Sequence, residues 1–216
     1  MNPEIEQDDE YTLRTKAYEV KPKDVPAHHS VWKTSILYTL LTIVLLGLIY
    51  PVVVTGIASV LFPHQAGGSL IKLNDGTIIG SELLAQSFTS DRYFHPRPSA
   101  AGNGYDATAS GGSNFAQSNL KLVQRMQGDI DKLAKENPGK PVPIDMVTTS
   151  GSGLDPDITP DAAAFQIPRI AKTRGLTEDA VRTLVEQHTT GRQYGMLGEP
   201  RVNVLQLNIA LDQLKK

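Results

Sequence analysis

One long stretch without a charged side chain most constrains how this chain can fold. No Asp, Glu, Lys or Arg occurs between Lys33 and Lys72, and residues 35–62 (SILYTLLTIVLLGLIYPVVVTGIASVLF) are almost continuously apolar. As a helix these 28 residues measure about 42 Å, which exceeds the roughly 30 Å hydrocarbon core of a bilayer. The pattern predicts one transmembrane helix over residues 34–62.

The segment before this helix argues against a cleaved signal peptide. A signal peptide has an apolar region of about 7 to 15 residues close to the N-terminus. Here residues 1–33 come first; they begin with an acidic run (EIEQDDE), contain three prolines, among them Pro22 and Pro26, and lack apolar periodicity. We expect residues 1–33 to be a disordered tail and the apolar helix to be a retained anchor.

Basic residues are distributed unequally around the apolar segment. Five lie in the 20 residues that end at its N-terminal border: Arg14, Lys16, Lys21, Lys23 and Lys33. The matching window on the other side contains Lys72 alone. Because flanking Lys and Arg residues stay on the cytoplasmic side, a single-pass protein of the cell membrane is predicted, with a cytoplasmic tail and an extracytoplasmic domain over residues 63–216.

Charge and cysteine content narrow the functions open to that domain. Residues 63–216 contain sixteen Lys or Arg and sixteen Asp or Glu, without a basic run, so nucleic acid is not expected as a partner. The chain contains no cysteine. Disulfides therefore cannot stabilise the domain, and its apolar core must suffice.

Periodicity and capping signals predict an α+β domain that is mostly helical, with a minor β-sheet. Asn74-Asp75-Gly76 predicts a hairpin turn, and residues 142–148 (VPIDMVT) read as a strand. The predicted helices are a short one after Ser81, one from Ser118 to Glu136, one from Pro160 to about Gly175, one after Thr177 and one after Asn203.

A long segment rich in glycine and aromatic residues separates two of these elements. Residues 89–117 contain four glycines and almost no aliphatic side chain, and they include SGGSN at 110–114. Loops of this length are usually functional or disordered. We predict a docking loop for a partner, and packing of its aromatics onto the domain's own core is the alternative. The candidate contact residues are Tyr93, Phe94, Arg97, Tyr105 and Phe115.

Few residues form a pattern with catalytic or metal-binding chemistry. Ser118 and Lys121 match the S-x-x-K spacing of some serine hydrolases, but the companion K-T-G triplet is absent and a capping serine explains the pair. The five histidines are scattered, so no transition-metal site is expected. Asp155, Asp157 and Asp161 are close enough for calcium, yet turn and capping roles are favoured.

The apolar segment itself has a pattern typical of helix association. Gly47, Pro51, Thr55 and Ser59 recur every four residues, and Gly56 lies beside them. Small side chains let two membrane helices approach closely. We predict that this small-residue stripe contacts a partner helix.

Several long stretches of the sequence form a further pattern: GGSLI at 67–71, FTSDRYFHPRPSA at 88–100, SGGSNFAQSN at 110–119, TTSGSGLDPDITPDAAAFQIPRIAKTRGL at 148–176 and VNVLQLNIALDQL at 202–214. Together they resemble one known family, the C subunit of the potassium-transporting Kdp P-type ATPase. The resemblance runs from about Ser35 to the C-terminus. The acidic N-terminal tail departs from the family pattern, so no family function extends to it.

The resemblance implies a non-catalytic subunit of an ATP-driven, high-affinity K⁺ uptake complex. Its partners would be a channel-like K⁺-binding subunit and a P-type subunit that hydrolyses ATP. The family is described as a catalytic chaperone that raises the ATP affinity of the hydrolysing subunit, and Gln166 best fits the glutamine proposed to contact nucleotide. No cofactor of the chain itself is expected. A membrane-anchored serine hydrolase and a solute-binding module are the alternative classes.

Overall fold

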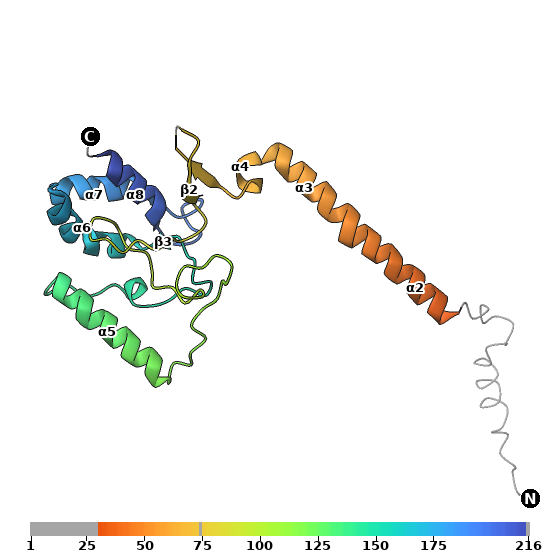
Figure 1. Cartoon of the computed structure of the whole chain (residues 1–216), viewed down its shortest axis with the longest axis horizontal. Coiled ribbons are helices and arrows are strands. Elements are labelled where there is room, and N and C mark those ends of the chain that lie inside the picture. The colour runs from red at the N-terminus through yellow and green to blue at the C-terminus, as the bar shows by residue number, and fades with distance from the viewer. Residues whose placement is uncertain (1–29, 74, 215–216) are drawn as a thin grey trace, which may run out of the picture. The chain divides into compact units, whose positions relative to one another are not determined.

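The protein is described by a computed structural model that covers residues 30–73 and 75–214 (Figure 1). It divides into two units, one ending at Ala66 and one beginning at Gly67. Most of the predicted N-terminal tail, up to residue 29, lies outside the described residues. Each unit is described separately below.

The first unit is a long apolar helix from Val31 to Leu61, long and apolar enough to cross a membrane (Figure 1). It consists of α2 (Val31–Thr42), a π-helical segment η2 (Ile43–Ile49) and α3 (Tyr50–Leu61), and the short α4 (Pro63–Ala66) follows. Pro51 has no N–H to donate to the carbonyl of Gly47, and its ring would clash with that carbonyl in a regular α-helix. The wider π turn lies where this interruption falls.

The second unit begins with an antiparallel hairpin, β1 (Leu70–Lys72) and β2 (Ile78–Ser81). The turn predicted around Asp75 and Gly76 is thereby confirmed. The helix predicted after Ser81 is wrong, because residues 82–88 form a turn followed by irregular chain. Their backbone groups bind elsewhere: the Ala85 N–H donates to the carbonyl of Leu154, and Glu82 N–H to that of Ser69.

Four helices and a small sheet make up the rest of this unit, which confirms the α+β class. The helices are α5 (Leu120–Glu136), α6 (Pro160–Arg174), α7 (Glu178–Gln187) and α8 (Val204–Gln213). The sheet has the order β3-β5-β4 and is antiparallel, with strands β3 (Asp157–Ile158), β4 (Thr189–Thr190) and β5 (Arg201–Asn203).

Local sequence signals predicted the starts of three of these helices, α6, α7 and α8, correctly. The side chains of Thr159, Thr177 and Asn203 each accept a hydrogen bond from the first turn of α6, α7 and α8. Gly175 ends α6 with a φ of 66°, a left-handed conformation that glycine adopts without steric cost. Pro168 lies inside α6, which nevertheless continues to Arg174.

Two predicted features are corrected by the structure. Residues 142–148 are not a strand; they contain one 3₁₀ turn, η3 (Ile144–Met146), because Asp145 turns inward and binds the N-cap residue of α6. Ser118 is not the cap of α5. Asn119 takes that role, and its side chain accepts a hydrogen bond from the Lys121 N–H.

The apolar core lies where α6, α7, α8 and the three-stranded sheet meet. Its fully buried members include Ala162 and Ile170 of α6, Val181 of α7, and Leu207 and Leu211 of α8. Helix α5 contributes little to this core, since Leu133 is its one buried residue. The core of this unit therefore rests mainly on α6, α7 and α8.

Candidate functional site

The candidate site is built around residues 91–105, hereafter the clamped segment. It contains no regular helix or strand. Its backbone groups therefore need other hydrogen-bond partners, because a buried unpaired N–H or C=O destabilises a fold. Polar side chains from α6 and α8 supply them.

Two buried amides hold the centre of the clamped segment. Asn208 of α8 accepts from the Phe94 N–H at 2.8 Å and donates to the Phe94 carbonyl at 3.0 Å. Gln166 of α6 accepts from the His95 N–H at 2.8 Å and donates to the His95 carbonyl at 3.2 Å. Both side chains are nearly inaccessible to solvent, with 2% and 3% exposure. Each amide thus makes the two backbone hydrogen bonds that a neighbouring strand would otherwise make to one residue.

Two arginines hold the start of the clamped segment. Arg174 is buried; it donates to the carbonyl of Arg92 at 2.7 Å and to Asp212 at 2.7 Å, and it lies 5.0 Å from the ring centre of Tyr93. Arg169 donates to the carbonyls of Asp91 and Tyr93 at 2.7 and 3.1 Å. Both guanidinium groups donate hydrogen bonds to backbone oxygens, so they fix the backbone of the clamped segment in place.

A second set of contacts holds the end of the clamped segment against the loop before β3. Arg97 forms an ion pair with Asp155 at 2.9 Å. The Tyr105 hydroxyl donates to the Arg97 carbonyl at 2.8 Å, and Ser99 Oγ donates to the Gly153 carbonyl at 2.6 Å. Burial raises the pKa of Tyr105, which keeps its hydroxyl protonated as a donor.

The glycine-rich stretch at 110–114 packs against a second serine–glycine loop. Gly111 N–H and the Ser110 hydroxyl both donate to the Ser152 carbonyl, at 2.8 and 3.1 Å. A side chain at Gly153 would lie 2.7 Å from the backbone of Ala101 and of Gly111. The structure therefore assigns Gly153 to close contact between the two chain segments.

The predicted docking residues have different environments. Phe94 is fully buried in the core, so for this side chain the alternative of core packing is correct. Tyr93, Arg97 and Tyr105 are half-buried and bonded within the domain. Phe115 is 44% exposed. A docking role stays a prediction for the residues that reach the surface.

Gln166 has little capacity left for a ligand. Its Oε1 accepts from the His95 N–H and from Arg169, and its Nε2 donates to the carbonyls of His95 and Ala162. A nucleotide contact would have to displace part of this network. That contact stays a prediction from the family resemblance.

Sequence reasoning missed Asn208, Arg169 and Arg174 as the residues that hold the segment. A signal for Asn208 existed, because it follows Val204 by four residues and precedes Leu211 by three, so it falls on the apolar stripe of α8. A polar side chain on such a stripe indicates a buried group with a partner. The identity of that partner was not readable, since it lies 114 residues away.

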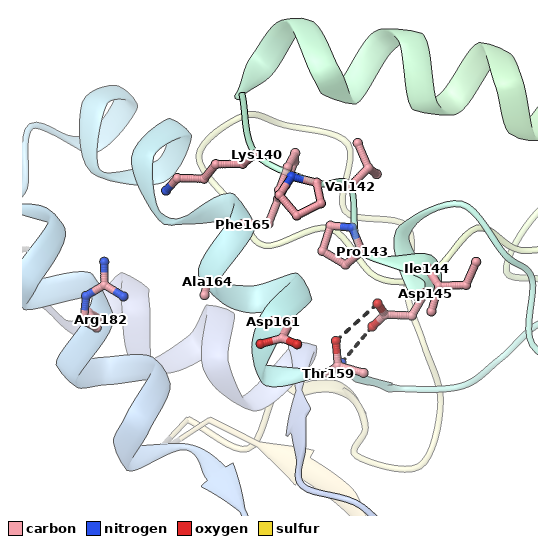
Figure 2. A pocket seen from close by; sticks show the side chains of 11 residues that line it. Lys140, Val142, Pro143, Ile144, Asp145, Thr159, Asp161, Ala164, Phe165 and Arg182 are labelled. Carbon is pink, nitrogen blue, oxygen red and sulfur yellow. Dashed lines mark hydrogen bonds between the residues drawn. The ribbon is translucent and has the colours of Figure 1, made fainter. Parts of the chain in front are cut away.

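A surface pocket of about 510 Å³ lies between α6, α7 and η3. Figure 2 shows Lys140 and Arg182 on one side and Asp145 with Thr159 on the other. Asp145 accepts from the Thr159 N–H and hydroxyl at 2.8 and 3.2 Å, so its carboxylate is already occupied. The pocket has the size of a small-molecule site. Gln166 does not line it.

The structure does not bring the residues considered for metal binding or catalysis together into one site. Among the described residues no group of three His, Cys, Asp or Glu side chains could hold a metal ion. Asp155 and Asp157 pair with Arg97 and Arg201. Burial raises the pKa of Asp157 despite its contact with Arg201. Within the same described ranges, no hydrogen bond joins Ser118 to Lys121.

The small-residue stripe of the apolar helix is fully accessible in the single chain. Gly47, Pro51, Thr55, Gly56 and Ser59 are all exposed. No atom lies within 4 Å of a Cβ built at Gly47 or Gly56. Space for a second helix is present, and Gly47 lies within the π-helical segment η2.

Comparison with known proteins assigns the family. The family model described as "KdpC: K+-transporting ATPase, c chain" matches residues 32–213. A potassium-transporting ATPase KdpC subunit from Koribacter versatilis is 56% identical over 179 residues, covering 83% of this chain and 92% of that protein. The corresponding subunit of Acidobacterium capsulatum is 56% identical over 183 residues, covering 84% and 97%. The chain therefore belongs to the KdpC family of potassium-transporting ATPase subunits.

Proposed function

We propose that this chain is a non-catalytic accessory subunit of an ATP-driven, high-affinity K⁺ uptake complex, in which it supports assembly and stability. The carrying observation is the family match over residues 32–213. Its partners are a channel-like K⁺-binding subunit and a P-type subunit that hydrolyses ATP. The polar groups of the clamped segment are used for internal hydrogen bonds, which suits a rigid binding module better than an enzyme.

The proposed attachment to the membrane partner runs through the small-residue stripe. The stripe crosses the junction between η2 and α3, and π-helical turns often occur at functional sites. The small side chains and this π-helical segment together favour close packing over simple anchoring.

The proposed orientation places the tail in the cytoplasm and the domain outside, from the five-to-one excess of basic residues before the helix. ATP is then on the other side of the membrane from the domain. An effect on the ATP affinity of the hydrolysing subunit would pass through the complex, since Gln166 is 3% exposed and its hydrogen-bonding groups are occupied. Protease added outside spheroplasts should remove the domain; protection of the domain would reverse this orientation.

The assembly role is tested with the double variant Gly47→Leu/Ser59→Leu. Two leucines should block close approach of a partner helix, yet they keep the segment apolar enough to insert. The complex should then fail to co-purify, and cells that depend on this transporter should stop growing at micromolar K⁺ but not at millimolar K⁺.

The matched control is Val53→Leu/Ile57→Leu, which changes bulky residues on the opposite face of the same helix. This control should leave both the complex and growth at low K⁺ intact. Normal recovery of the complex with the stripe variant would refute the docking face. The exposed part of residues 89–117 would then become the favoured attachment surface.

The pocket between α6, α7 and η3 supports a second candidate, a solute-binding module. Ala164 lines the pocket and is partly exposed, so Ala164→Phe should fill it without disturbing the buried face of α6. An assembly subunit should tolerate this change. Loss of growth at low K⁺ with an intact complex would favour solute binding.

A further inference from the structure

The pocket between α6, α7 and η3 has two basic side chains on one side that form no ion pair within the described part of the chain. They are Lys140, from the turn after α5, and Arg182, from α7 (Figure 2). Six other arginines of the same unit each have an acidic partner at 3.6 Å or less. Arg182 therefore differs from most arginines around it.

Arg182 has acidic residues of its own helix within reach. Glu178 precedes it by four residues on α7 and Glu186 follows it by four. Side chains four apart on a helix are neighbours, and Glu before a basic residue is the favourable order. In the described ranges neither glutamate forms an ion pair with Arg182, whose side chain lines the pocket instead. Its guanidinium group is thus directed to a place where an anion from outside the chain can bind.

Apolar side chains form the wall and the floor beside these two cations. Phe165 is 6% exposed and lies with Ala164 on α6, below the loop of residues 141–143 (Figure 2). Two of these three loop residues are prolines, which have no N–H to donate and a fixed φ. The wall is therefore apolar and stiff. Apolar walls with a few charged groups are typical of a small-molecule site.

Two carboxylates limit the charge that a ligand of this pocket can carry. Asp145 accepts two hydrogen bonds from Thr159, so it is occupied. Asp161 lines the pocket on the first turn of α6 and has no ion pair among the described residues. The two basic and two acidic side chains cancel, and Asp161 would repel a second negative charge. One negative charge on an apolar body fits best.

We propose that this pocket binds a small organic monoanion, a carboxylate attached to an aromatic or aliphatic body. The carboxylate lies between Lys140 and Arg182, where charge-assisted hydrogen bonds hold it, and the body packs on Phe165 and residues 141–143. The inference rests on the solute-binding candidate above, whose ligand it names, and it is compatible with an assembly role. A polyphosphate such as a nucleotide does not fit this charge pattern.

Isothermal titration calorimetry of the full-length chain in detergent tests the ligand class. Hydrocinnamate is the monoanionic probe, hydrocinnamyl alcohol its neutral analogue and phenyl phosphate a dianionic analogue, and each is also titrated into detergent alone. We expect saturable binding of hydrocinnamate and binding of the other two that is weaker by about tenfold or more. Equal binding of the acid and the alcohol would overturn the proposal.

Variants of the chain test the residues. Lys140→Gln/Arg182→Gln should weaken hydrocinnamate binding by about tenfold or more, with an unchanged thermal unfolding midpoint, since both side chains are exposed. The matched control is Lys121→Gln/Lys132→Gln on α5, which changes the net charge equally but does not line the pocket. The control should bind like the wild type. Equal affinities of the two double variants would contradict the assignment.

The binding measurement uses the isolated chain, so its result does not depend on the assembly test with the small-residue stripe. If the wild type does not bind hydrocinnamate but Ala164→Phe still prevents growth at low K⁺ with an intact complex, the ligand class is wrong and the solute-binding candidate stands. Acylation of Lys140 gives a further test. Protection of Lys140 by hydrocinnamate supports the proposal, whereas protection only by the partner subunits would overturn it, since a protein segment would then fill the pocket.

Discussion

Two tyrosines in the same backbone conformation distinguish two irregular regions of the domain. Tyr105, at the end of the clamped segment, has a φ of 57°, and Tyr194, in the loop Arg192–Glu199, has a φ of 53°. A left-handed conformation is uncommon for a residue with a side chain. Tyr105 is half-buried and bonded through its N–H and its hydroxyl, whereas Tyr194 is 90% exposed.

The difference lies in what compensates the strained conformation. Tyr105 itself is held by Ser99 and Arg97 of the same segment, and distant side chains such as Asn208 and Gln166 in turn hold that segment through its backbone. In the Arg192–Glu199 loop the compensation is local, because Gln193 and Leu197 exchange both backbone hydrogen bonds, at 2.8 and 2.9 Å. The first region should be sensitive to changes far away in sequence, and the second only to changes within itself.

The largest loss of stability is expected for Asn208→Ala, which removes a distant partner of the clamped segment. The change leaves the buried N–H and carbonyl of Phe94 without partners, and each such group costs about 1 to 3 kcal/mol. We expect the free energy of unfolding to fall by about 2 to 5 kcal/mol, measured by urea denaturation of the full chain in detergent.

Gln206→Ala is the matched control on the same helix. Gln206 is exposed and binds Glu82 at the surface, so the loss should be within about 0.5 kcal/mol. Similar losses for the two variants would show that the amide clamp does not stabilise the domain.

Gly153→Ala should have the next largest effect. Gly153 has a φ of 69°, and its new Cβ would lie 2.7 Å from backbone atoms of Ala101 and Gly111, so the two serine–glycine loops would have to separate. A loss of about 1 to 3 kcal/mol is expected in the same assay.

Gly151→Ala, two residues earlier in the same loop, meets no atom within 4 Å and should change stability by less than about 0.5 kcal/mol. Equal tolerance at both positions would contradict the close contact between residues 110–112 and 150–153.

The same contrast explains what the sequence could predict. The apolar helix, the hairpin turn and the starts of α6, α7 and α8 depend on local signals, such as Thr159 before Pro160, and were predicted correctly. Residues 89–117 were predicted as a docking loop because of their length and their mix of aromatic and arginine side chains. Their order comes from partners 70 to 120 residues away, such as Gln166 for His95 and Asp212 for Tyr93, and no local pattern encodes such pairs.

Removing the hydroxyl group should affect stability differently at the two tyrosines. Tyr105→Phe deletes the hydrogen bond to the Arg97 carbonyl and should cost about 0.5 to 1.5 kcal/mol. Tyr194→Phe deletes a hydroxyl from a side chain that is 90% exposed and should leave stability unchanged. If Tyr194→Phe instead weakens co-purification with the partner subunits, the Arg192–Glu199 loop is a contact surface.

The smallest effect concerns pH and again separates the clamped segment from the rest. Burial, and secondarily the positive charge of Arg169, lowers the pKa of His95 below its ordinary value of 6.5; Lys132 acts in the same direction, and Ser90 and Asp91 oppose it. The unfolded chain then binds a proton at a higher pH than the folded one. Stability is therefore full above about pH 6.5 and falls as the pH drops toward the lowered pKa.

Thermal unfolding of His95→Gln should show a weaker decline over this range, because glutamine does not titrate, whereas His64→Gln, in the first unit, should keep the decline of the wild type. An unchanged slope in His95→Gln would mean that another group in the domain carries the pH dependence, and that His95 is protonated as readily in the clamp as in the unfolded chain.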